Sequence, residues 1–355
     1  MMTLFIGTYT SEGAEGIYES TFDTETGTLS EPRCIAKAAQ PSYVALHPRG
    51  LPFLYAVNEL AGPDGKSGGA VSSFSRSVET GLLTLINSRP SAGKGPCHVS
   101  CHPGGTWVGV ANYASGTAAV FPVGTDGALG EASSVVTHPE LPGPGGVKSP
   151  HAHNFAFDAS GRWAFVADLG LDRLMIYRFD QDRGILHPHD PASISAKPGA
   201  GPRALSLFPD GRRACLVNEL DSTLALLDLD PERAATRVLE TKSTLPPGWS
   251  GSNSCADVHV HPGGRFVFCS NRGHDSIAAF AVDGNRLAFL GCQPTGGKTP
   301  RSFCLDPGGR WLLAANQHTH DITCFRIDQS TGALSPVGSP LSVPAPVCLK
   351  LAPDR

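Results

Sequence analysis

The sequence predicts an all-β chain that folds as a seven-bladed β-propeller. Three observations predict this class: one segment recurs along the whole chain, each copy joins two strand-like stretches by a turn, and turn-forming residues are abundant. Of the 355 residues, 41 are Gly and 30 are Pro, while hydrophobic residues make up 40% and suffice for a buried core. Many short strands joined by many turns fit this composition.

The repeat consists of an apolar stretch that ends at a turn proline, followed by a second apolar stretch that ends in a small polar residue. The segment GPRALSLFPDGRRACLVNEL, residues 201–220, is one copy, and another copy has Ala159 in place of the proline. We define the anchor of a copy as the residue seven positions before this turn position. The seven anchors are 41, 96, 152, 202, 255, 300 and 346, at spacings of 45 to 56 residues. Repeats of this length with several short strands are typical of propeller blades.

The last copy shares its blade with the N-terminus. It begins at Pro346, and the sequence ends at Arg355 before a blade is complete, whereas the N-terminal stretch TLFIGTY resembles the second strand of the other copies. The stretch GIYESTFDTETGTLS resembles their outer strands. We therefore expect the N- and C-terminal strands to pair in one blade, which closes the ring and removes open sheet edges. The chain is predicted to be a single domain over residues 1–355.

Charge and composition limit the classes of partner. The formal net charge is -4 and there is no block of Lys or Arg, which disfavours binding to nucleic acid or to an anionic membrane. The N-terminal residues contain no signal peptide or apolar run that could span a membrane, so we expect a cytoplasmic protein. The ten cysteines include no CxxC pair and are interpreted as reduced core residues rather than metal ligands. A small-molecule partner is expected.

Charged residues gather at one end of the predicted hairpins. A turn centred near Gly211 places Arg203 opposite Glu219 at the open end of its hairpin, provided that the register is regular. The first of these two positions is held, copy by copy, by Ser42, Cys97, His153, Arg203, Ala256, Arg301 and Val347. The second is held by Glu59, Tyr113, Leu169, Glu219, Arg272, Gln317 and, approximately, Tyr9. Because other copies have apolar residues at these two positions, the repeat itself does not require charged residues there.

These residue types predict a site for an anionic small molecule with a carbonyl carbon, at one mouth of the propeller channel. Arginine binds phosphate or carboxylate through two hydrogen bonds and stays charged, while histidine and glutamate can transfer a proton. The candidate catalytic residues are His153, Arg203 and Glu219. The candidate substrate-binding residues are Arg272, Arg301, Gln317, Asp257, His98 and Glu59. The competing interpretation is that Arg203 and Glu219 form only a cross-strand salt bridge.

Other polar residues are predicted to be structural. We expect His47, His102 and His261, each next to a turn proline, to stabilise turns. Asp168 and Asp172 are expected to bind backbone groups. The Asn residues that end the second strands are expected to be structural, and His318 and His320 are expected to be exposed rather than to bind a metal.

Four motifs in order resemble the seven-bladed lactonase family, which includes propeller-type 6-phosphogluconolactonases and fungal carboxymuconate-lactonising enzymes. They are PHAHNFAFDASGRWAFVADLGLDRLMIYRFD, GPRALSLFPDGRRACLVNEL, SNRGHDSIAAF and TPRSFCLDPGGRWLLAANQ, and the resemblance covers essentially the whole chain. It implies an enzyme that opens or forms a lactone without an organic cofactor. It also implies catalytic roles for His153, Arg203 and Glu219. The HAH motif offers both His151 and His153, and we prefer His153 because it falls at the repeat position defined above.

The resulting hypothesis is hydrolysis of 6-phospho-D-glucono-1,5-lactone to 6-phosphogluconate, a step of the pentose phosphate pathway. Glu219 or His153 would deprotonate water, and Arg203 would stabilise the oxyanion at the lactone carbonyl. Arg272 and Arg301 would hold the phosphate. Two alternatives remain open at this point: a cycloisomerase that forms a lactone from a carboxylated cis,cis-muconate, and a propeller that serves as a binding module without catalysis.

Overall fold

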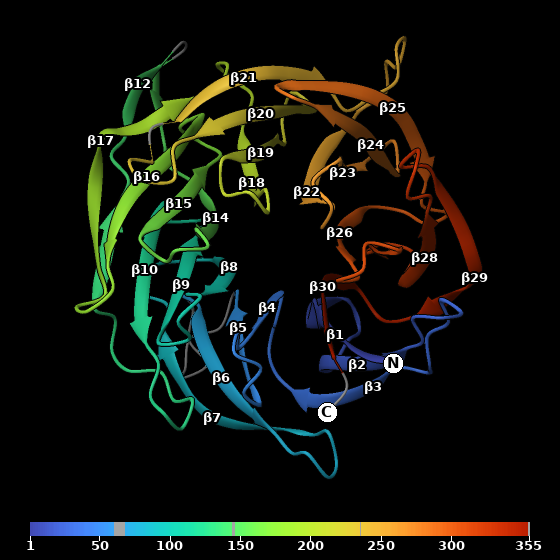
Figure 1. The fold of residues 1–355 in the computed structure, drawn as a ribbon. Coiled ribbons are helices and arrows are strands. Elements are labelled where there is room, and N and C mark those ends of the chain that lie inside the picture. The colour runs from blue at the N-terminus through green and yellow to red at the C-terminus, as the bar shows by residue number, and fades with distance from the viewer. Residues whose placement is uncertain (60–67, 144–145, 235, 354–355) are drawn as a thin grey trace. The chain divides into compact units, whose positions relative to one another are not determined.

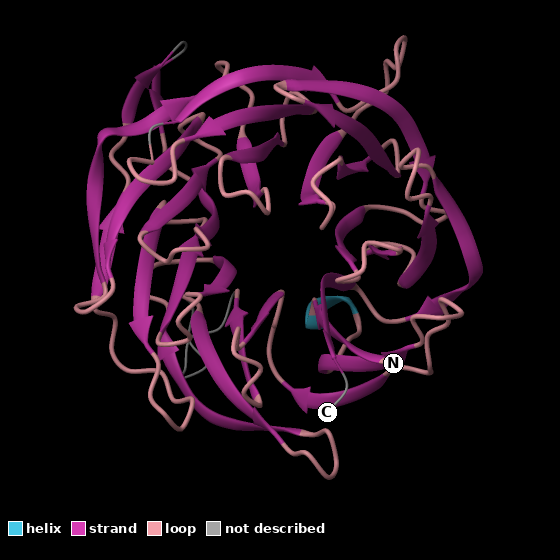
Figure 2. Cartoon of the chain, in the orientation of Figure 1, coloured by secondary structure: helices cyan, strands magenta, loops and turns pink. Residues whose placement is uncertain are grey.

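The computed structural model describes residues 1–353 except for 60–67, 144–145 and 235. In the described residues the chain forms the strands β1 to β30 and the short 3₁₀ helix η1 (Thr10–Glu12) (Figure 2). The strands make seven four-stranded sheets and the separate hairpin β12–β13. This organisation confirms the predicted fold class, an all-β seven-bladed β-propeller. No helix in the described part of the chain has the length and hydropathy that crossing a bilayer requires.

Contacts divide the chain into two compact units. The first unit contains Met1–Ala14, Tyr18–Arg33 and Arg203–Arg355, and the second contains Glu15–Ile17 and Cys34–Pro202. The single domain over residues 1–355 therefore stays a prediction.

The first unit contains the sheets formed by the C-terminal half and by the N-terminus. Their strands are β18 to β21 (Pro202–Leu207, Arg213–Asn218, Thr223–Leu229, Thr236–Ser243), β22 to β25 (Ser254–Val260, Phe266–Arg272, Ser276–Asp283, Arg286–Pro294), β26 to β29 (Pro300–Leu305, Trp311–Asn316, Asp321–Ile327, Leu334–Ser342), and β30, β1 and most of β2 (Pro346–Pro353, Met2–Thr8, Gly16–Phe22). Strand β3 (Arg33–Lys37) belongs, except for its first residue, to the second unit.

The second unit contains three four-stranded sheets and the extra hairpin. Their strands are β4 to β7 (Tyr43–Leu46, Phe53–Asn58, Ala70–Arg76, Leu83–Pro90), β8 to β11 (Pro96–Cys101, Trp107–Asn112, Thr117–Pro122, Ser134–Thr137), β14 to β17 (Ala152–Phe157, Trp163–Asp168, Arg173–Asp180, Ile185–Ser195), and β12 and β13 (Leu141–Gly143, Gly146–Lys148).

One sheet joins the two ends of the chain. Strand β30 pairs antiparallel with β1, from Met2 opposite Pro353 to Thr8 opposite Pro346. Strand β1 continues the sheet through β2, so the N-terminal strands complete the blade that the C-terminal strand begins (Figure 1). The predicted pairing of N- and C-terminal strands is confirmed.

The core lies between neighbouring sheets of each unit. In the first unit, Phe208 and Leu226 of one sheet pack against Val258 and Phe280 of the next, and all four side chains are buried. The ten cysteines are free thiols. The predicted core positions of four of them are confirmed, because these side chains are buried: Cys215, Cys269, Cys304 and Cys324.

The hairpins contain a β-bulge at the position that carries the candidate residues. In four copies the anchor pairs with the Asn or Asp sixteen residues later: Pro96 with Asn112, Ala152 with Asp168, Cys255 with Asn271 and Pro300 with Asn316. The register shifts directly after each of these pairs, so the regular register assumed for these hairpins is wrong. In three of them the extra residue is Cys97, His153 or Arg301. A bulge redirects the side chain of its extra residue, and bulges are common next to active sites.

The turn histidines have a second role that the sequence did not reveal. His261 Nδ1 accepts a hydrogen bond from Gly263 N–H in its own turn (3.0 Å), and its Nε2 lies 2.9 Å from the carbonyl oxygen of Gly309 in the next sheet. Because Nδ1 accepts, Nε2 carries the proton and donates. His47 and His102 make the same contact with Gly105 and Gly161. The predicted turn role is confirmed, and each histidine also joins neighbouring sheets.

Candidate active site

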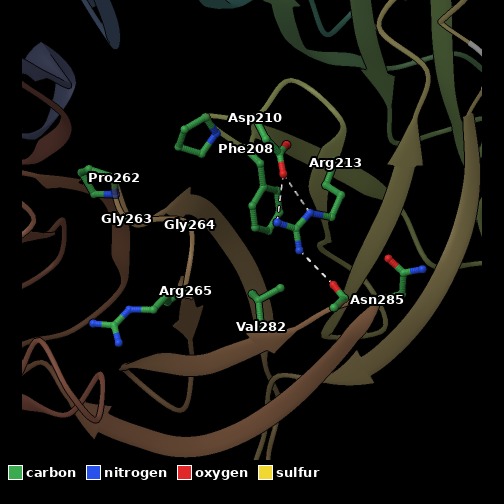
Figure 3. A pocket seen from close by; sticks show the side chains of 11 residues that line it. Phe208, Asp210, Arg213, Pro262, Gly263, Gly264, Arg265, Val282 and Asn285 are labelled. Atoms are coloured by element: carbon green, nitrogen blue, oxygen red, sulfur yellow. Dashed lines mark hydrogen bonds and ion pairs between the residues drawn. The ribbon is translucent and has the colours of Figure 1, made fainter.

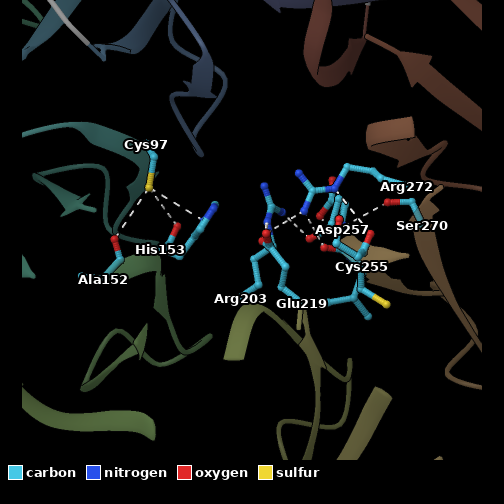
Figure 4. A network of polar contacts seen from close by, with 12 residues as sticks. Cys97, Ala152, His153, Arg203, Glu219, Cys255, Asp257, Ser270 and Arg272 are labelled. Carbon is cyan, nitrogen blue, oxygen red and sulfur yellow. Dashed lines mark hydrogen bonds and ion pairs between the residues drawn. The ribbon is translucent and has the colours of Figure 1, made fainter. Parts of the chain in front are cut away.

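The centre of the site in the first unit is a carboxylate held between two guanidinium groups. Arg203 lies on β18, Glu219 follows β19, and Arg272 ends β23 of the neighbouring sheet. Arg203 Nε is 2.7 Å from Glu219 Oε2, and Arg272 Nη2 is 2.9 Å from Glu219 Oε1. Figure 4 shows the three side chains pointing toward one another. The predicted contact between Arg203 and Glu219 is confirmed by this ion pair, and Arg272 joins them from the next sheet.

Backbone carbonyl groups fix the orientation of both arginines. Arg203 Nη1 donates to the carbonyl oxygen of Ala256, and Arg272 Nη2 donates to that of Cys255 (3.0 Å). Only 8% of the Arg203 side chain, 13% of that of Arg272 and 19% of that of Glu219 are exposed. Arg203 Nε faces Glu219 and Nη1 donates one of its two hydrogens to Ala256, so Nη2 and the second hydrogen of Nη1 can donate to a ligand oxygen.

The arginines keep Glu219 ionised. Burial alone would raise the pKa of the Glu219 carboxyl, but the charges of Arg203, Arg272 and Arg301 outweigh it and lower the pKa. Burial, together with the charge of Arg203, lowers the pKa of Arg272 to about 10, and Glu219 opposes this change. Both groups are therefore charged at neutral pH. A carboxylate whose pKa is lowered is also a weaker proton acceptor.

A second cluster in the first unit forms around the N-terminal loop. Arg301 lies at the bulge of β26, with Cζ 5.3 Å from the centre of the Tyr9 ring, which is a cation–π distance. Gln317 follows β27 and its Nε2 donates to Glu12 Oε1 (2.9 Å) in η1. Glu12 was not predicted, because the loop that contains it has no counterpart in the other copies. Only the position of Tyr9 in the repeat pointed to this loop.

Asp257 lies on β22 and joins its sheet to the neighbouring sheet. Its Oδ2 accepts hydrogen bonds from Ser302 Oγ (2.9 Å) and Phe303 N–H (3.3 Å) of β26. Its Oδ1 accepts from Val258 N–H (3.0 Å), and the side chain is buried. Burial tends to raise the pKa of Asp257, but the nearby His259 and other cations lower it well below its usual range. These contacts favour a structural role over the predicted substrate contact.

The remaining candidate residues belong to the second unit. His153 is half-buried at the bulge of β14, with its ring edge-on to Tyr113 (centroids 5.4 Å apart) and Nδ1 3.8 Å from Cys97 Sγ (Figure 4). The ring of His151 stacks on that of Tyr113, with the ring centroids 4.6 Å apart. His151 Nδ1 also donates a hydrogen bond to the backbone carbonyl oxygen of Tyr113 (3.0 Å). His98 lies on β8 and is buried next to Asn154 of β14. Glu59 follows β5 directly.

The structure thus brings together Arg203, Glu219 and Arg272, with Arg301 close enough to influence their ionisation. Gln317 and Asp257 lie in the same unit, whereas His153, His98 and Glu59 lie in the other. The meeting of His153 with the arginines stays a prediction.

A cavity of about 540 Å³ lies elsewhere in the first unit (Figure 3). It is formed by the turns at the far ends of the hairpins β18–β19 and β22–β23, where Arg213 is bound by Asp210 and by the carbonyl oxygen of Gly284. The candidate residues Arg203, Glu219 and Arg272 lie at the opposite ends of these hairpins. The cavity is therefore not the predicted site.

Two further sequence predictions are confirmed. His318 and His320 are exposed, and His318 Nδ1 lies 2.9 Å from Thr299 Oγ1. Asp172 binds backbone groups, because it accepts hydrogen bonds from the N–H groups of Gly199 and Gly201, both at 2.8 Å. The second of these bonds holds the chain directly before β18.

A family model described as "Lactonase, 7-bladed beta-propeller" matches residues 3–351. The chain belongs to this lactonase family. A Bacillus subtilis (strain 168) protein named 6-phosphogluconolactonase is 36% identical over 348 residues, which cover 98% of this chain and 97% of the relative. A Formosa agariphila protein of the same name is 30% identical over 355 residues, with 96% of each chain covered. The prediction of a lactonase is confirmed at the level of the family.

The solved structures similar to this lactonase include one described as a periplasmic gluconolactonase of Pseudomonas aeruginosa. Its TM-score is 0.91, its sequence is 31% identical, and the alignment covers 100% of this chain and 99% of that chain. The Pseudomonas aeruginosa name lacks the phosphate group that the other two names include, and it places that protein in the periplasm. A cytoplasmic location of this lactonase therefore stays a prediction.

Proposed function

We propose that this lactonase hydrolyses a sugar lactone that carries an anionic group, and that the substrate is 6-phospho-D-glucono-1,5-lactone. The observation that carries the proposal is the arrangement of Arg203 and Arg272 around Glu219, with Arg301 nearby. Three positive charges around one carboxylate leave an excess of positive charge, which attracts an anionic substrate. The names of the Bacillus subtilis and Formosa agariphila relatives agree with a phosphorylated lactone.

Arg203 is proposed to stabilise the oxyanion. Its guanidinium is held by Glu219 and by a backbone carbonyl group, so its remaining N–H groups have a defined direction before the substrate binds. Donors that are oriented in advance toward a developing negative charge lower the barrier of acyl transfer, typically by a few kcal/mol. Glu219 would then act as the group that orients Arg203.

His153 is proposed to be the general base, in preference to Glu219. Both oxygens of Glu219 face guanidinium groups, and its lowered pKa makes it a poor proton acceptor. The water oxygen would attack the carbonyl carbon while His153 takes its proton, which gives a tetrahedral intermediate whose oxyanion faces Arg203. The bond from this carbon to the ring oxygen then breaks, and the ring oxygen takes the proton from His153. This mechanism requires His153 to lie beside Arg203, which is part of the proposal.

Arg272 and Arg301 are proposed to bind the phosphate. Arginine binds phosphate oxygens through pairs of charge-assisted hydrogen bonds, which also define the orientation of the substrate. Although the pKa of Arg272 is lowered to about 10, it still lies well above neutral pH, so the site stays cationic across the neutral range.

The test compares the hydrolysis of three lactones by the wild-type protein: the 6-phosphorylated gluconolactone, gluconolactone and a muconolactone. Acid release is followed after subtraction of spontaneous hydrolysis. We expect kcat/KM to be at least 10-fold higher for the phosphorylated substrate. Equal values for all three would refute phosphate recognition, preference for the muconolactone would favour the cycloisomerase, and no turnover of any would contradict the proposed function.

A further inference from the structure

We propose that Asp168, held by His138, is a positioning residue for His153. This inference rests on the proposed role of His153 as the general base. All the residues concerned lie in the second unit, around the hairpin β14–β15 that carries His153.

His138 and Asp168 form a fully buried pair. His138 follows β11, and its Nδ1 lies 2.5 Å from Asp168 Oδ2; the side chains are 1% and 0% exposed. A carboxylate oxygen accepts, so Nδ1 carries the proton. Nε2 of His138 has no hydrogen-bond partner in the part of the chain that the structure describes.

The other oxygen of Asp168 holds the backbone directly before the bulge of β14. Asp168 Oδ1 accepts hydrogen bonds from His151 N–H (2.9 Å) and from Leu171 N–H (3.0 Å). His151 lies two residues before His153, and its ring stacks on Tyr113, whose ring is in turn T-shaped to that of His153. The Asp168 carboxylate therefore fixes the chain from which the His153 side chain projects.

The equivalent hairpins show that strand pairing alone does not require this carboxylate. Asn112 occupies the same place opposite its anchor, and its Nδ2 donates to the carbonyl oxygen of Ser91 (3.0 Å). Ser91 corresponds to His138 in position. Ser91 directly follows β7 and His138 directly follows β11, the fourth strands of their sheets, and the backbone N–H of each donates the first hydrogen bond after that strand. Asn112 Oδ1 has no partner among the described residues. The neutral amide of Asn112 thus binds the segment after the fourth strand but not the backbone before the bulge. Asp168 binds both, and it does so in the hairpin that carries His153.

The test uses Asp168→Asn, the double variant Asp168→Asn with His138→Ser, and Asp158→Asn as a matched control. In Asp168→Asn the single amide oxygen cannot replace two carboxylate oxygens that accept from His138, His151 and Leu171. We expect kcat to fall about 10- to 100-fold while KM changes less than threefold. The double variant copies the pair Asn112 and Ser91, and we expect it to regain thermal stability but not kcat.

The control removes a different buried carboxylate from the same hairpin. Asp158 accepts backbone hydrogen bonds from Trp163 (2.8 Å) and Ser160 (3.1 Å) at the far turn. Asp158→Asn is expected to lower stability and to leave kcat within threefold of the wild type. A double variant that regains wild-type kcat, or an Asp168→Asn variant with unchanged kcat, would overturn the positioning role.

An NMR measurement separates this inference from the proposed function, because it needs no substrate. The ring resonances of His153, assigned with His153→Gln, are followed against pH. We expect Asp168→Asn to shift these resonances and Asp158→Asn to leave them in place. Unchanged His153 resonances in Asp168→Asn would overturn the inference. If the resonances shift but the wild type hydrolyses no lactone, the proposed function fails while the positioning of His153 stands.

Discussion

Replacement of Glu219 by glutamine tests the centre of the site with the least change in shape. The substitution removes one negative charge from between Arg203 and Arg272 and keeps a side chain of the same length. The amide offers one oxygen and one NH₂ group, so only one guanidinium keeps an acceptor while the other faces a donor. Arg203 should lose its defined direction, and the repulsion between the two arginines is no longer compensated.

The expected magnitudes follow from burial and from the proposed role. Removing one partner of a fully buried ion pair costs about 3–5 kcal/mol. Glu219 keeps some exposure and glutamine keeps one hydrogen bond, so we expect a loss of about 2–3 kcal/mol in the free energy of unfolding. With about 2.1 cal/mol/K of unfolding entropy per residue, the 355-residue chain should lose about 3–4 °C in Tm. If Arg203 stabilises the oxyanion, kcat should fall about 100-fold.

The assay measures kcat per folded molecule with the phosphorylated lactone, together with thermal unfolding. The matched control is Glu19→Gln, which breaks the ion pair of Glu19 with Arg33 in the same unit, where Arg33 Nε donates to Glu19 Oε1 (2.8 Å). The control should lose stability and keep its activity. If Glu219→Gln loses stability but keeps kcat within threefold, Glu219 and Arg203 form only a structural salt bridge and the reasoning is refuted.

The pH dependence gives a second reading of the same variant. The pKa of Glu219 is lower in the folded protein than its ordinary value of 4.5. Its ion pairs therefore stabilise the wild type fully above that value, and this stabilisation is lost as the pH falls through the folded-state pKa. The difference in stability between wild type and Glu219→Gln should be constant near neutrality and should shrink below about pH 4.5.

Three further predictions concern the proposed base, the phosphate contact and the contacts between sheets. His153→Ala should lower kcat by about 10²- to 10⁴-fold with unchanged Tm, measured by initial rates, and a loss under threefold would exclude it as the base. Arg301→Ala should reduce kcat/KM about 10- to 100-fold for the phosphorylated lactone and less than threefold for gluconolactone; equal losses would argue against a phosphate contact. Gly309→Ala places a Cβ 2.2 Å from His261 Nε2, whereas Gly264→Ala, at a similar positive φ, meets open space. By chemical denaturation, Gly309→Ala should be at least about 1 kcal/mol more destabilising, and equal losses would show that the histidine contact contributes little.

The repeat made most of the fold predictable. Each hairpin is a local structure whose turn, apolar stretches and terminal Asn recur at a nearly constant spacing, so the two strands of each hairpin could be located from the sequence. The bulge that follows could not, because an extra residue in one strand leaves the spacing of turns and anchors unchanged. It nevertheless decides the direction of the His153 side chain.

The candidate site was predictable only where it depends on one hairpin. Arg203 and Glu219 lie on the two arms of a single hairpin, so their contact follows from the position of the turn. Arg272 comes from the neighbouring sheet, and its distance from Glu219 depends on how the two sheets pack. Glu12 comes from a loop outside the repeat, and no pattern linked it to Gln317.

The amino-acid order was enough to predict the all-β class, the seven blades, the pairing of the terminal strands, the contact of Arg203 with Glu219 and the resemblance to the lactonases. These features depend on local periodicity and on repeated spacing, which are properties of the chain order. Three contacts became visible only in the folded chain: Arg272 also binds Glu219, the turn histidines join neighbouring sheets, and His138 is buried against Asp168. These contacts join residues from different strands or sheets, and their distances depend on packing and side-chain orientation, which no spacing along the chain encodes.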